Sequence, residues 1–311
     1  MFSRDTIHIY LILAASVLVF AGAVIAILKF GLKKNAEHAW RSFVGWLIMI
    51  PLVIGAILLG RAATIVFLGI VAIAGFTEFA RATGLYRDWL ITGWVYVGIA
   101  AITTVTLIPP PGENLIGWYG MFMALPVYVV AGILLMPILR DRTKGQLQVI
   151  ALGIVGFIYI GWMFGHLAFL ANDPRNGAGW ILFLLFSVPL CDVAAFTFGR
   201  IFGRTKMRPN ISPNKTWAGS LGAFLVGMAL PWLFRFSLTG FGTRELLLAG
   251  LIVGVGSQLG DLSISVIKRD IGIKDMGTLI EGHGGVLDRI DSLIYVAPLF
   301  FHMTRFFVGI A

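Results

Sequence analysis

Cysteine is almost absent from this sequence, which has Cys191 as its single cysteine among 311 residues. One cysteine excludes an intramolecular disulfide, and no pair or cluster of cysteine and histidine has the spacing of a zinc site. Any metal ion that the protein binds must therefore be held by oxygen ligands.

Charged residues are also scarce, at 13% of the sequence against 58% hydrophobic residues, and the mean hydropathy is +0.91. A soluble domain of this length would not tolerate so apolar a surface. The apolar run over residues 7–28 is longer than the core of a cleaved signal peptide, so we expect it to remain as a first span. The sequence predicts an all-α fold, a polytopic integral membrane helical bundle.

Long apolar runs recur along the whole chain. Taking ~20 apolar residues for each span, we expect about 9–10 transmembrane helices. The candidate ranges are 7–28, 43–60, 62–80, 89–108, 116–138, 147–171, 178–198, 217–236, 245–267 and 290–310. The second and third of these are closely coupled at Gly60 and Arg61.

The formal net charge of +9 is better explained by membrane topology than by nucleic-acid binding, because the sequence has no soluble basic module. With the amino terminus outside, most of the 24 Lys and Arg fall in loops on one side, which the positive-inside rule assigns to the cytosol. We therefore expect a multi-pass protein of the inner (cytoplasmic) membrane, with basic cytosolic loops that contact anionic lipid headgroups.

Ionisable residues are concentrated between residues 261 and 291, which hold five Asp and one Glu. Asp261, Ser265 and Lys268 follow at i, i+4 and i+7, so they share one face of a helix, and Asp288 and Asp291 repeat this pattern. The glycines between the two helices let the backbone approach a ligand and offer N–H groups to phosphate oxygens. The stretch predicts a metal and phosphate site; the alternative is a basic cytosolic loop with ordinary helix caps.

A second polar stretch precedes the first, between residues 192 and 217. Arg204, Ser212, Lys215 and Thr216 lie just beyond an apolar span and just before the next one, whose helix N-terminus attracts anions. The stretch predicts phosphate binding, with contact to lipid headgroups as the alternative. Asp192 lies within the preceding span, where a carboxylate is costly unless it pairs with a cation or a metal ion.

Two isolated polar residues lie in the amino-terminal half. Glu78 and Arg81 are separated by three positions, and we expect them to pair at a cytosolic helix end. His166 lies in the middle of an apolar range, where it either relays protons or packs as a hydrogen-bonded histidine.

These residues resemble the signature of the phosphatidate cytidylyltransferase (CDP-diacylglycerol synthase) family. The residues that match its carboxy-terminal signature are Ser265, Lys268, Arg269, Lys274, Asp275, Gly282, His283, Gly284, Gly285, Asp288, Arg289 and Asp291. Upstream, 203–205, 212–217 and 260–262 resemble two further blocks of the family. Two positions depart from the pattern, since Glu281 replaces the usual Pro and Ala218 replaces a frequent Glu or Gln.

The resemblance implies an enzyme of phospholipid biosynthesis that condenses CTP with phosphatidic acid to CDP-diacylglycerol and pyrophosphate. It implies Mg²⁺ held by Asp261 and Asp288, with Asp192 as a further candidate ligand and K⁺ as a candidate second ion. It also implies a homodimer and several residue roles. Phosphates would be neutralised by Lys268, Arg269 and Lys274 and bound by Ser265, with closure from the other side by Arg204, Ser212, Lys215 and Thr216. Backbone contacts would come from Gly284 and Gly285, and orientation from Asp275, His283, Arg289 and Asp291.

The domain organisation that follows is one continuous membrane domain. Residues 1–180 form amino-terminal scaffold helices, and 181–311 form a carboxy-terminal catalytic region with cytosolic active-site loops. Three alternatives stay open. The first is a paralogue acting on a different lipid phosphate, which the two departures favour; the others are an ion or solute transporter and a catalytically silent relative.

Overall fold

The computed structural model describes residues 4–27, 37–109, 117–277 and 284–309 of the chain. The elements are α1 (Arg4–Ala26), α2 (Glu37–Leu58), α3 (Arg61–Thr83), η2 (Leu85–Arg87), α4 (Trp89–Leu107), α5 (Tyr119–Leu139), α6 (Gln146–Val155), η3 (Gly156–Met163), α7 (Phe164–Phe169), η4 (Leu170–Asn172), α8 (Gly177–Phe202), β1 (Lys206–Arg208), β2 (Ser212–Thr216), α9 (Trp217–Leu233), η5 (Arg235–Ser237), α10 (Thr243–Asp270) and α11 (Leu287–Phe307). The predicted all-α membrane bundle is confirmed, because a helix occupies each candidate range.

Seven of the helices in the described ranges are long and apolar enough to cross a membrane. They are α1, α3, α4, α5, α8, α10 and the continuous helical stretch from α6 to η4. The apolar part of α2 and α9 are shorter. Helix α11 has 21 residues but carries Asp288, Arg289 and Asp291 in its first turns, and it is not among the seven.

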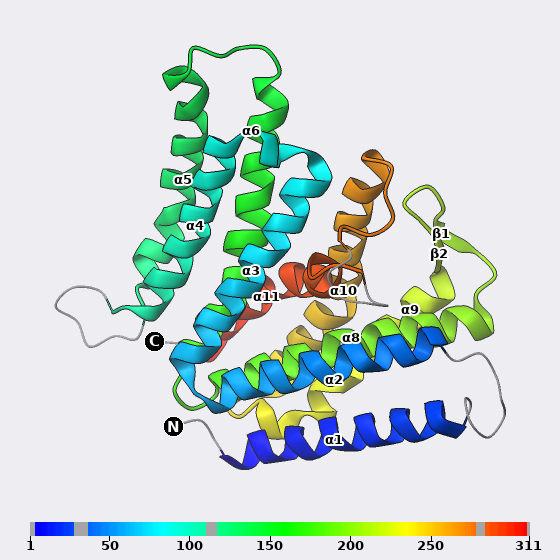
Figure 1. The fold of residues 1–311 in the computed structure, drawn as a ribbon. Coiled ribbons are helices and arrows are strands. Elements are labelled where there is room, and N and C mark those ends of the chain that lie inside the picture. Colours follow the sequence, from blue (N-terminus) through cyan, green and yellow to red (C-terminus); the bar gives the residue numbers. More distant parts are fainter. Residues whose placement is uncertain (1–3, 28–36, 110–116, 278–283, 310–311) are drawn as a thin grey trace.

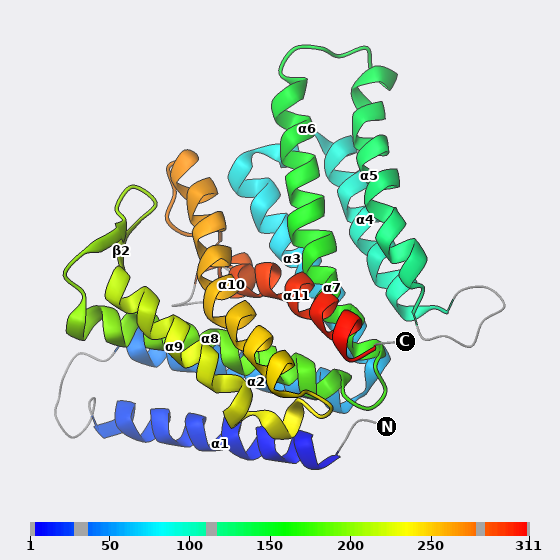
Figure 2. The same cartoon turned by 180° about the vertical axis from the view of Figure 1, so that it is seen from behind.

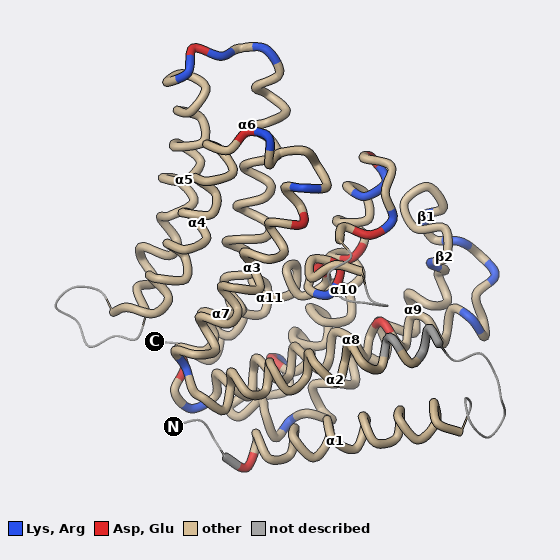
Figure 3. Tube along the Cα trace, in the orientation of Figure 1, with Lys and Arg blue, Asp and Glu red and all other residues tan. Residues whose placement is uncertain are grey.

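The helices form two groups that meet around α10 and α11. Figures 1 and 2 show α3 to α6 standing together, while α1, α2 and α8 run across the lower part of both views. Helices α10 and α11 lie between these groups, α9 runs along α8, and α10 packs against both α9 and α11. Lys and Arg gather on the upper side of Figure 3, at the α5–α6 connection, η2, the β1–β2 hairpin and the end of α10.

Glycine allows α9 and α10 to approach closely. A Cβ atom on Gly227 of α9 would lie in hard contact with the Cα atom of Gly254 of α10. Small residues at such crossings are the usual basis of helix association in membranes, where lipid removes the hydrophobic driving force between helices. The position of α10, which carries much of the polar chemistry, therefore depends on this contact.

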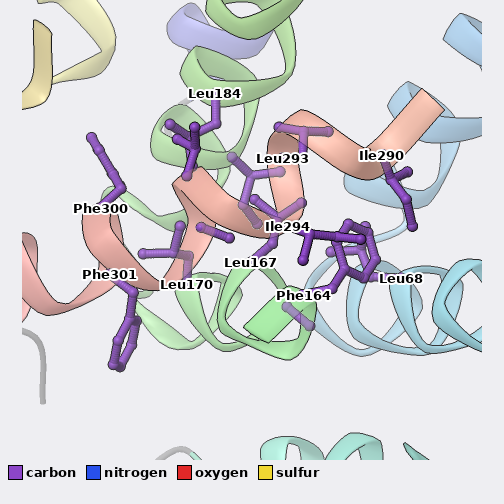
Figure 4. Packing of buried hydrophobic residues seen from close by; sticks show 14 of the residues in the cluster. Leu68, Phe164, Leu167, Leu170, Leu184, Ile290, Leu293, Ile294, Phe300 and Phe301 are labelled. Atoms are coloured by element: carbon purple, nitrogen blue, oxygen red, sulfur yellow. The ribbon is translucent and has the colours of Figure 1, made fainter. Parts of the chain in front are cut away.

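The part of α11 from Leu293 onward is anchored in the apolar core. Its residues Leu293, Ile294 and Phe300 are buried against side chains of neighbouring helices, among them Leu167 of α7 and Leu184 of α8 (Figure 4). The polar first turns of α11 are thus held in place by a buried apolar continuation.

Two local features were not predicted from the sequence. Strands β1 and β2 form an antiparallel hairpin with Lys206 opposite Thr216 and Arg208 opposite Ser212. The stretch Gly156–Met163 is a π-helix inside a span that was expected to be regular α-helix. Insertions of this kind widen a helix locally and are frequent near functional sites.

Candidate functional site

Helix α10 supplies the central face of the site. Asp261, Ser265 and Lys268 lie along one side of it, and the Ser265 hydroxyl donates to Oδ1 of Asp261 at 3.3 Å. Ser265 and Lys268 are buried, whereas the Asp261 side chain keeps 30% of its exposure. Of these three residues, Asp261 therefore presents the most accessible charge.

The hairpin carries Lys215 onto this face. The Nζ atom of Lys215 in β2 lies 2.5 Å from Oδ2 of Asp261. The next residue, Thr216, accepts the N–H of Gly219 on its hydroxyl oxygen at 3.1 Å and so caps the N-terminus of α9. A single strand end thus fixes both a helix start and an ion pair to the neighbouring helix.

Arg269 ties the hairpin to the end of α10. Its guanidinium donates to the carbonyl oxygens of Ile211 at 3.2 Å and Ile273 at 2.9 Å. The side chain is exposed, so these contacts lie at the accessible rim of the site.

A second ion pair joins α10 to α11. Nζ of Lys268 lies 2.9 Å from Oδ1 of Asp288, and Oδ2 of Asp288 accepts the N–H groups of Met276 and Gly285, each at 2.9 Å. The Gly285 N–H that was expected to face phosphate is therefore taken by this carboxylate. Gly284 has φ +79, and a Cβ atom there would lie 2.9 Å from Oδ2 of Asp288, so glycine is required for two reasons.

Two further carboxylates face the same region. Asp291 of α11 is buried and accepts both the N–H (2.7 Å) and the hydroxyl (3.3 Å) of Ser292 on its Oδ1. Asp192 of α8 lies within Coulombic range of Asp261, and Asp291 lies within range of both. Carboxylates of three helices therefore interact electrostatically in this region.

A tyrosine from the π-helix joins the crossing of α10 and α11. The Tyr159 hydroxyl lies 3.3 Å from the carbonyl oxygen of Gly260 and 3.5 Å from that of Asp291. Gly260 permits the close approach, since a Cβ atom there would lie 2.6 Å from the Asp291 carbonyl oxygen. The π-helix thus contributes to the support of Asp261 and Asp291.

Glu78 of α3 belongs to the site, which sequence reasoning missed. Its Oε1 accepts the N–H of Val286 at 2.9 Å, and its Oε2 accepts the N–H of Leu287 at 2.8 Å. The expected pair with Arg81 is wrong, since no such ion pair is formed between these two described residues and both Glu78 oxygens bond to backbone. No local pattern could have revealed a contact between residues so far apart in sequence.

The remaining predicted residues lie around this centre. Arg289 lies within Coulombic range of Asp192. Lys274 and Asp275 are exposed in the segment after α10, and Arg204 and Ser212 belong to the hairpin region. Ala218 lies in the first turn of α9. His283, Gly282 and Glu281 lie outside the described residues.

The donor set suits a hard cation in its chemistry. The converging side chains are carboxylates and hydroxyls, which are ligands that Mg²⁺ prefers. Both carboxylates are already engaged, Asp261 by Ser265 and Lys215 and Asp288 by Lys268 and two N–H groups, but the Asp261 side chain is the more accessible, at 30% exposure against 5%. Within the described ranges, no three Asp, Glu, His or Cys come close enough together to form a metal cluster. Two lysine ammonium groups supply the positive charge beside Asp261 and Asp288.

Known proteins resemble this chain over most of its length. The model of the cytidylyltransferase family matches residues 40–307. The chain is 32% identical to the uncharacterized protein YnbB of Escherichia coli (strain K12), over 88% of this chain and 89% of that protein. It is also 32% identical to a phosphatidate cytidylyltransferase of Brucella suis biovar 1, over 80% and 90%. A phosphatidate cytidylyltransferase of Mycobacterium bovis is 39% identical over 39% of this chain and 40% of that protein.

Proposed function

This chain belongs to the cytidylyltransferase family, and from that membership we propose that it is a phosphatidate cytidylyltransferase of phospholipid biosynthesis. It condenses CTP with phosphatidic acid to give CDP-diacylglycerol and pyrophosphate. The observation that best supports this proposal is the ion pair between Lys215 of the hairpin and Asp261 of α10. It places a lysine from one motif beside a carboxylate from the other, as a site for a charged triphosphate requires.

The proposed reaction is a nucleotidyl transfer between two phosphates. An oxygen of the lipid phosphate attacks the α-phosphorus of CTP, a new P–O bond forms, and the bond from the α-phosphorus to the bridging oxygen breaks to release pyrophosphate. The lipid phosphomonoester is already largely ionised near neutral pH, so no general base is needed. Positioning and charge neutralisation are the main tasks of the protein.

Cationic side chains from two sides of the site would neutralise the charge of the phosphates. Lys215 and Arg204 of the hairpin region approach from one side, with Ser212 and the capped N-terminus of α9 beside them. Lys268, Arg269 and Lys274 approach from the other side. Thr216 supports this arrangement through its cap, and Asp275, Asp291 and Arg289 orient the neighbouring groups.

Mg²⁺ is the cofactor that the donor set supports. Asp261 would hold it on release of Lys215, and Asp288 would join only on release of Lys268. Asp192 is a further candidate ligand. A bound Mg²⁺ supplies positive charge to the triphosphate oxygens. A role for K⁺ as second ion, a role for His283 and a homodimer remain predictions.

We place the site at the cytosolic face of the inner membrane. The gathering of Lys and Arg on one side of the molecule supports this placement (Figure 3). The lipid substrate would then enter sideways between helices, with its acyl chains in the hydrocarbon layer and its phosphate at the site.

The test is an assay of the purified protein with CTP, Mg²⁺ and a panel of lipid phosphates. The panel holds phosphatidic acid, lysophosphatidic acid and a polyprenyl phosphate, and the readouts are pyrophosphate release and the mass of the lipid product. We expect CDP-diacylglycerol from phosphatidic acid, and loss of turnover in Asp261→Asn. A product formed only from another lipid phosphate would establish the paralogue alternative. That alternative stays open because the chain also matches YnbB over 88% of its length, and the name of YnbB states no activity. If the protein turned over none of these lipid phosphates, the proposal would be overturned.

A further inference from the structure

We propose that Glu78 of α3 is a positioning residue that sets the orientation of Asp288 by holding the start of α11. The inference rests on the proposed function, because the site that Glu78 supports is the one assigned to nucleotidyl transfer. It brings a helix of the amino-terminal half into the catalytic region.

The contacts of Glu78 suit this role. Only 8% of the residue is exposed, and its two oxygens accept the N–H groups of Val286 and Leu287. The first N–H groups of a helix have no partner within the helix, and a carboxylate there is favoured by the helix dipole. Glu78 therefore acts as an N-terminal cap for α11 that comes from another helix.

Two glycines leave the space that the same carboxylate occupies. A Cβ atom on Gly277 would lie 2.5 Å from Oε1 of Glu78, and one on Gly285 would lie in hard contact with Oε2. Glycine at these positions is therefore needed for the approach of Glu78.

Asp288 lies one residue beyond the segment that Glu78 holds. Its own carboxylate bonds to the N–H groups of Gly285 and Met276 and to Lys268. The short segment 285–288 is thus fixed by α3 through Glu78 and by α10 through Lys268. A displacement of this segment would move Asp288 relative to Lys268.

A cap that only adds stability would make the same hydrogen bonds, so the test must separate the two roles. The variants are Glu78→Gln, which keeps the size but loses the charge and one acceptor, and Glu78→Asp, which keeps the charge. The matched control is Asp88→Asn, since Asp88 also caps a helix by accepting the N–H of Ile91 and pairs with Arg140, away from the site.

We expect faster amide hydrogen exchange in peptides covering 284–288 for Glu78→Gln, and a kcat about 100-fold lower with the KM for CTP little changed. Glu78→Asp should recover part of the rate. Asp88→Asn should lower the melting temperature and leave kcat intact. The inference is overturned if Glu78→Gln loses as much stability as Asp88→Asn but keeps its kcat.

The exchange measurement does not depend on knowing the substrate. If the wild-type protein turns over no lipid phosphate, the proposed function fails, while unchanged exchange in 284–288 would separately refute the role of Glu78. If Glu78→Gln does not fold, the comparison of Glu78→Asp with wild type decides by the same two readouts.

A different observation carries a second inference: the structure assigns one acyl chain of the lipid substrate to an apolar cavity between α1, α2 and α8. The cavity has a volume of about 490 Å³, and all of its lining side chains are apolar. Among them are Ala21 of α1, Trp46 of α2, and Pro189 and Val193 of α8. This inference also rests on the proposed function.

The position of the cavity on α8 identifies its occupant. Its lining extends along α8 from Leu182 to Val193, about 16 Å at 1.5 Å per residue. Val193 follows Asp192, which lies within Coulombic range of Asp261 and Lys215. A molecule with its phosphate at the site can therefore place a long apolar tail along α8, and the cavity is comparable in volume to one such chain.

The test fills the cavity from α1. Ala21→Trp places a large ring among the lining residues, whereas Ala23→Trp, the matched control, adds the same ring on the exposed side of the same helix. We expect Ala21→Trp to raise the KM for long-chain phosphatidic acid about tenfold, to favour short-chain substrates and to leave the KM for CTP unchanged. Ala23→Trp should behave like wild type.

Equal chain-length preference in the two variants would refute the assignment of the cavity. Absence of turnover in wild type with every lipid phosphate would refute the proposed function instead. In that case the amount of lipid that co-purifies with Ala21→Trp and Ala23→Trp still tests the cavity, because equal amounts would contradict it.

Discussion

The ammonium nitrogen of Lys268 lies 2.9 Å from a carboxylate oxygen of Asp288, and the two side chains keep only 9% and 5% of their exposure. This pair joins the end of α10 to the start of α11. Lys215 and Asp261 form the other lysine–carboxylate pair of the site, and their side chains keep 23% and 30% of their exposure, so this pair is far more open to solvent. The two pairs should therefore respond differently to the same substitution.

Lys268→Met should destabilise the protein strongly. Removal of one partner leaves the Asp288 charge buried without its cation, which typically costs ~3–5 kcal/mol. The measurement is thermal or denaturant unfolding of the purified protein. The double variant Lys268→Met/Asp288→Asn should recover part of the loss, and a single variant as stable as wild type would contradict the buried ion pair.

Lys215→Met should change activity more than stability. Solvent-exposed ion pairs contribute only ~0–1 kcal/mol, so unfolding should hardly shift. Loss of a cation that faces the triphosphate should raise the KM for CTP about tenfold. Lys206→Met, in the paired strand of the same hairpin, is the control; an unchanged KM for CTP in Lys215→Met would restrict the hairpin to lipid contact.

Thr216→Val should destabilise the start of α9. The threonine hydroxyl accepts the N–H of Gly219, and loss of such a cap costs about 1 kcal/mol. Thr216→Ser keeps the hydroxyl and should keep most of the stability in the same unfolding measurement. A serine variant less stable than the valine variant would show that the methyl group rather than the cap is the important part of Thr216.

Gly227→Ala should prevent the normal packing of α9 on α10, because its Cβ atom would collide with the backbone of Gly254. We expect a marked loss of monodisperse protein on size-exclusion chromatography. Gly93→Ala is the matched control, since a Cβ atom at Gly93 in α4 meets no atom within 4 Å. A normal elution profile for Gly227→Ala would show that the two helices can separate without harm.

The helices could be predicted because their signal is local. Each span is a continuous apolar run, and even the break between α2 and α3 was visible at Gly60, which has φ +103. The hairpin was missed because its strands are short and polar; the turn residues Pro209 and Asn210 were its main signal. The π-helix at 156–163 was missed because its composition does not differ from that of an apolar α-helix.

The candidate site was predictable only where its residues lie close in sequence. The helical spacing placed Asp261, Ser265 and Lys268 on one face, and the structure has them there. The partners of Asp261 and Asp288 required the fold, since Lys215 comes from the hairpin and Glu78 from α3. The division of the chain at residue 180 remains a prediction, although Glu78 shows that the first part contributes directly to the site.

The attachment of the hairpin has a consequence for how the protein meets its ligand. The hairpin is tied to α10 by two cations, Lys215 on Asp261 and Arg269 on the carbonyl oxygen of Ile211. An incoming phosphate would compete for those same cations, so ligand binding and hairpin attachment oppose each other thermodynamically. Substrates that bind tightly would therefore weaken the attachment of the hairpin to α10, and high salt would have the same effect.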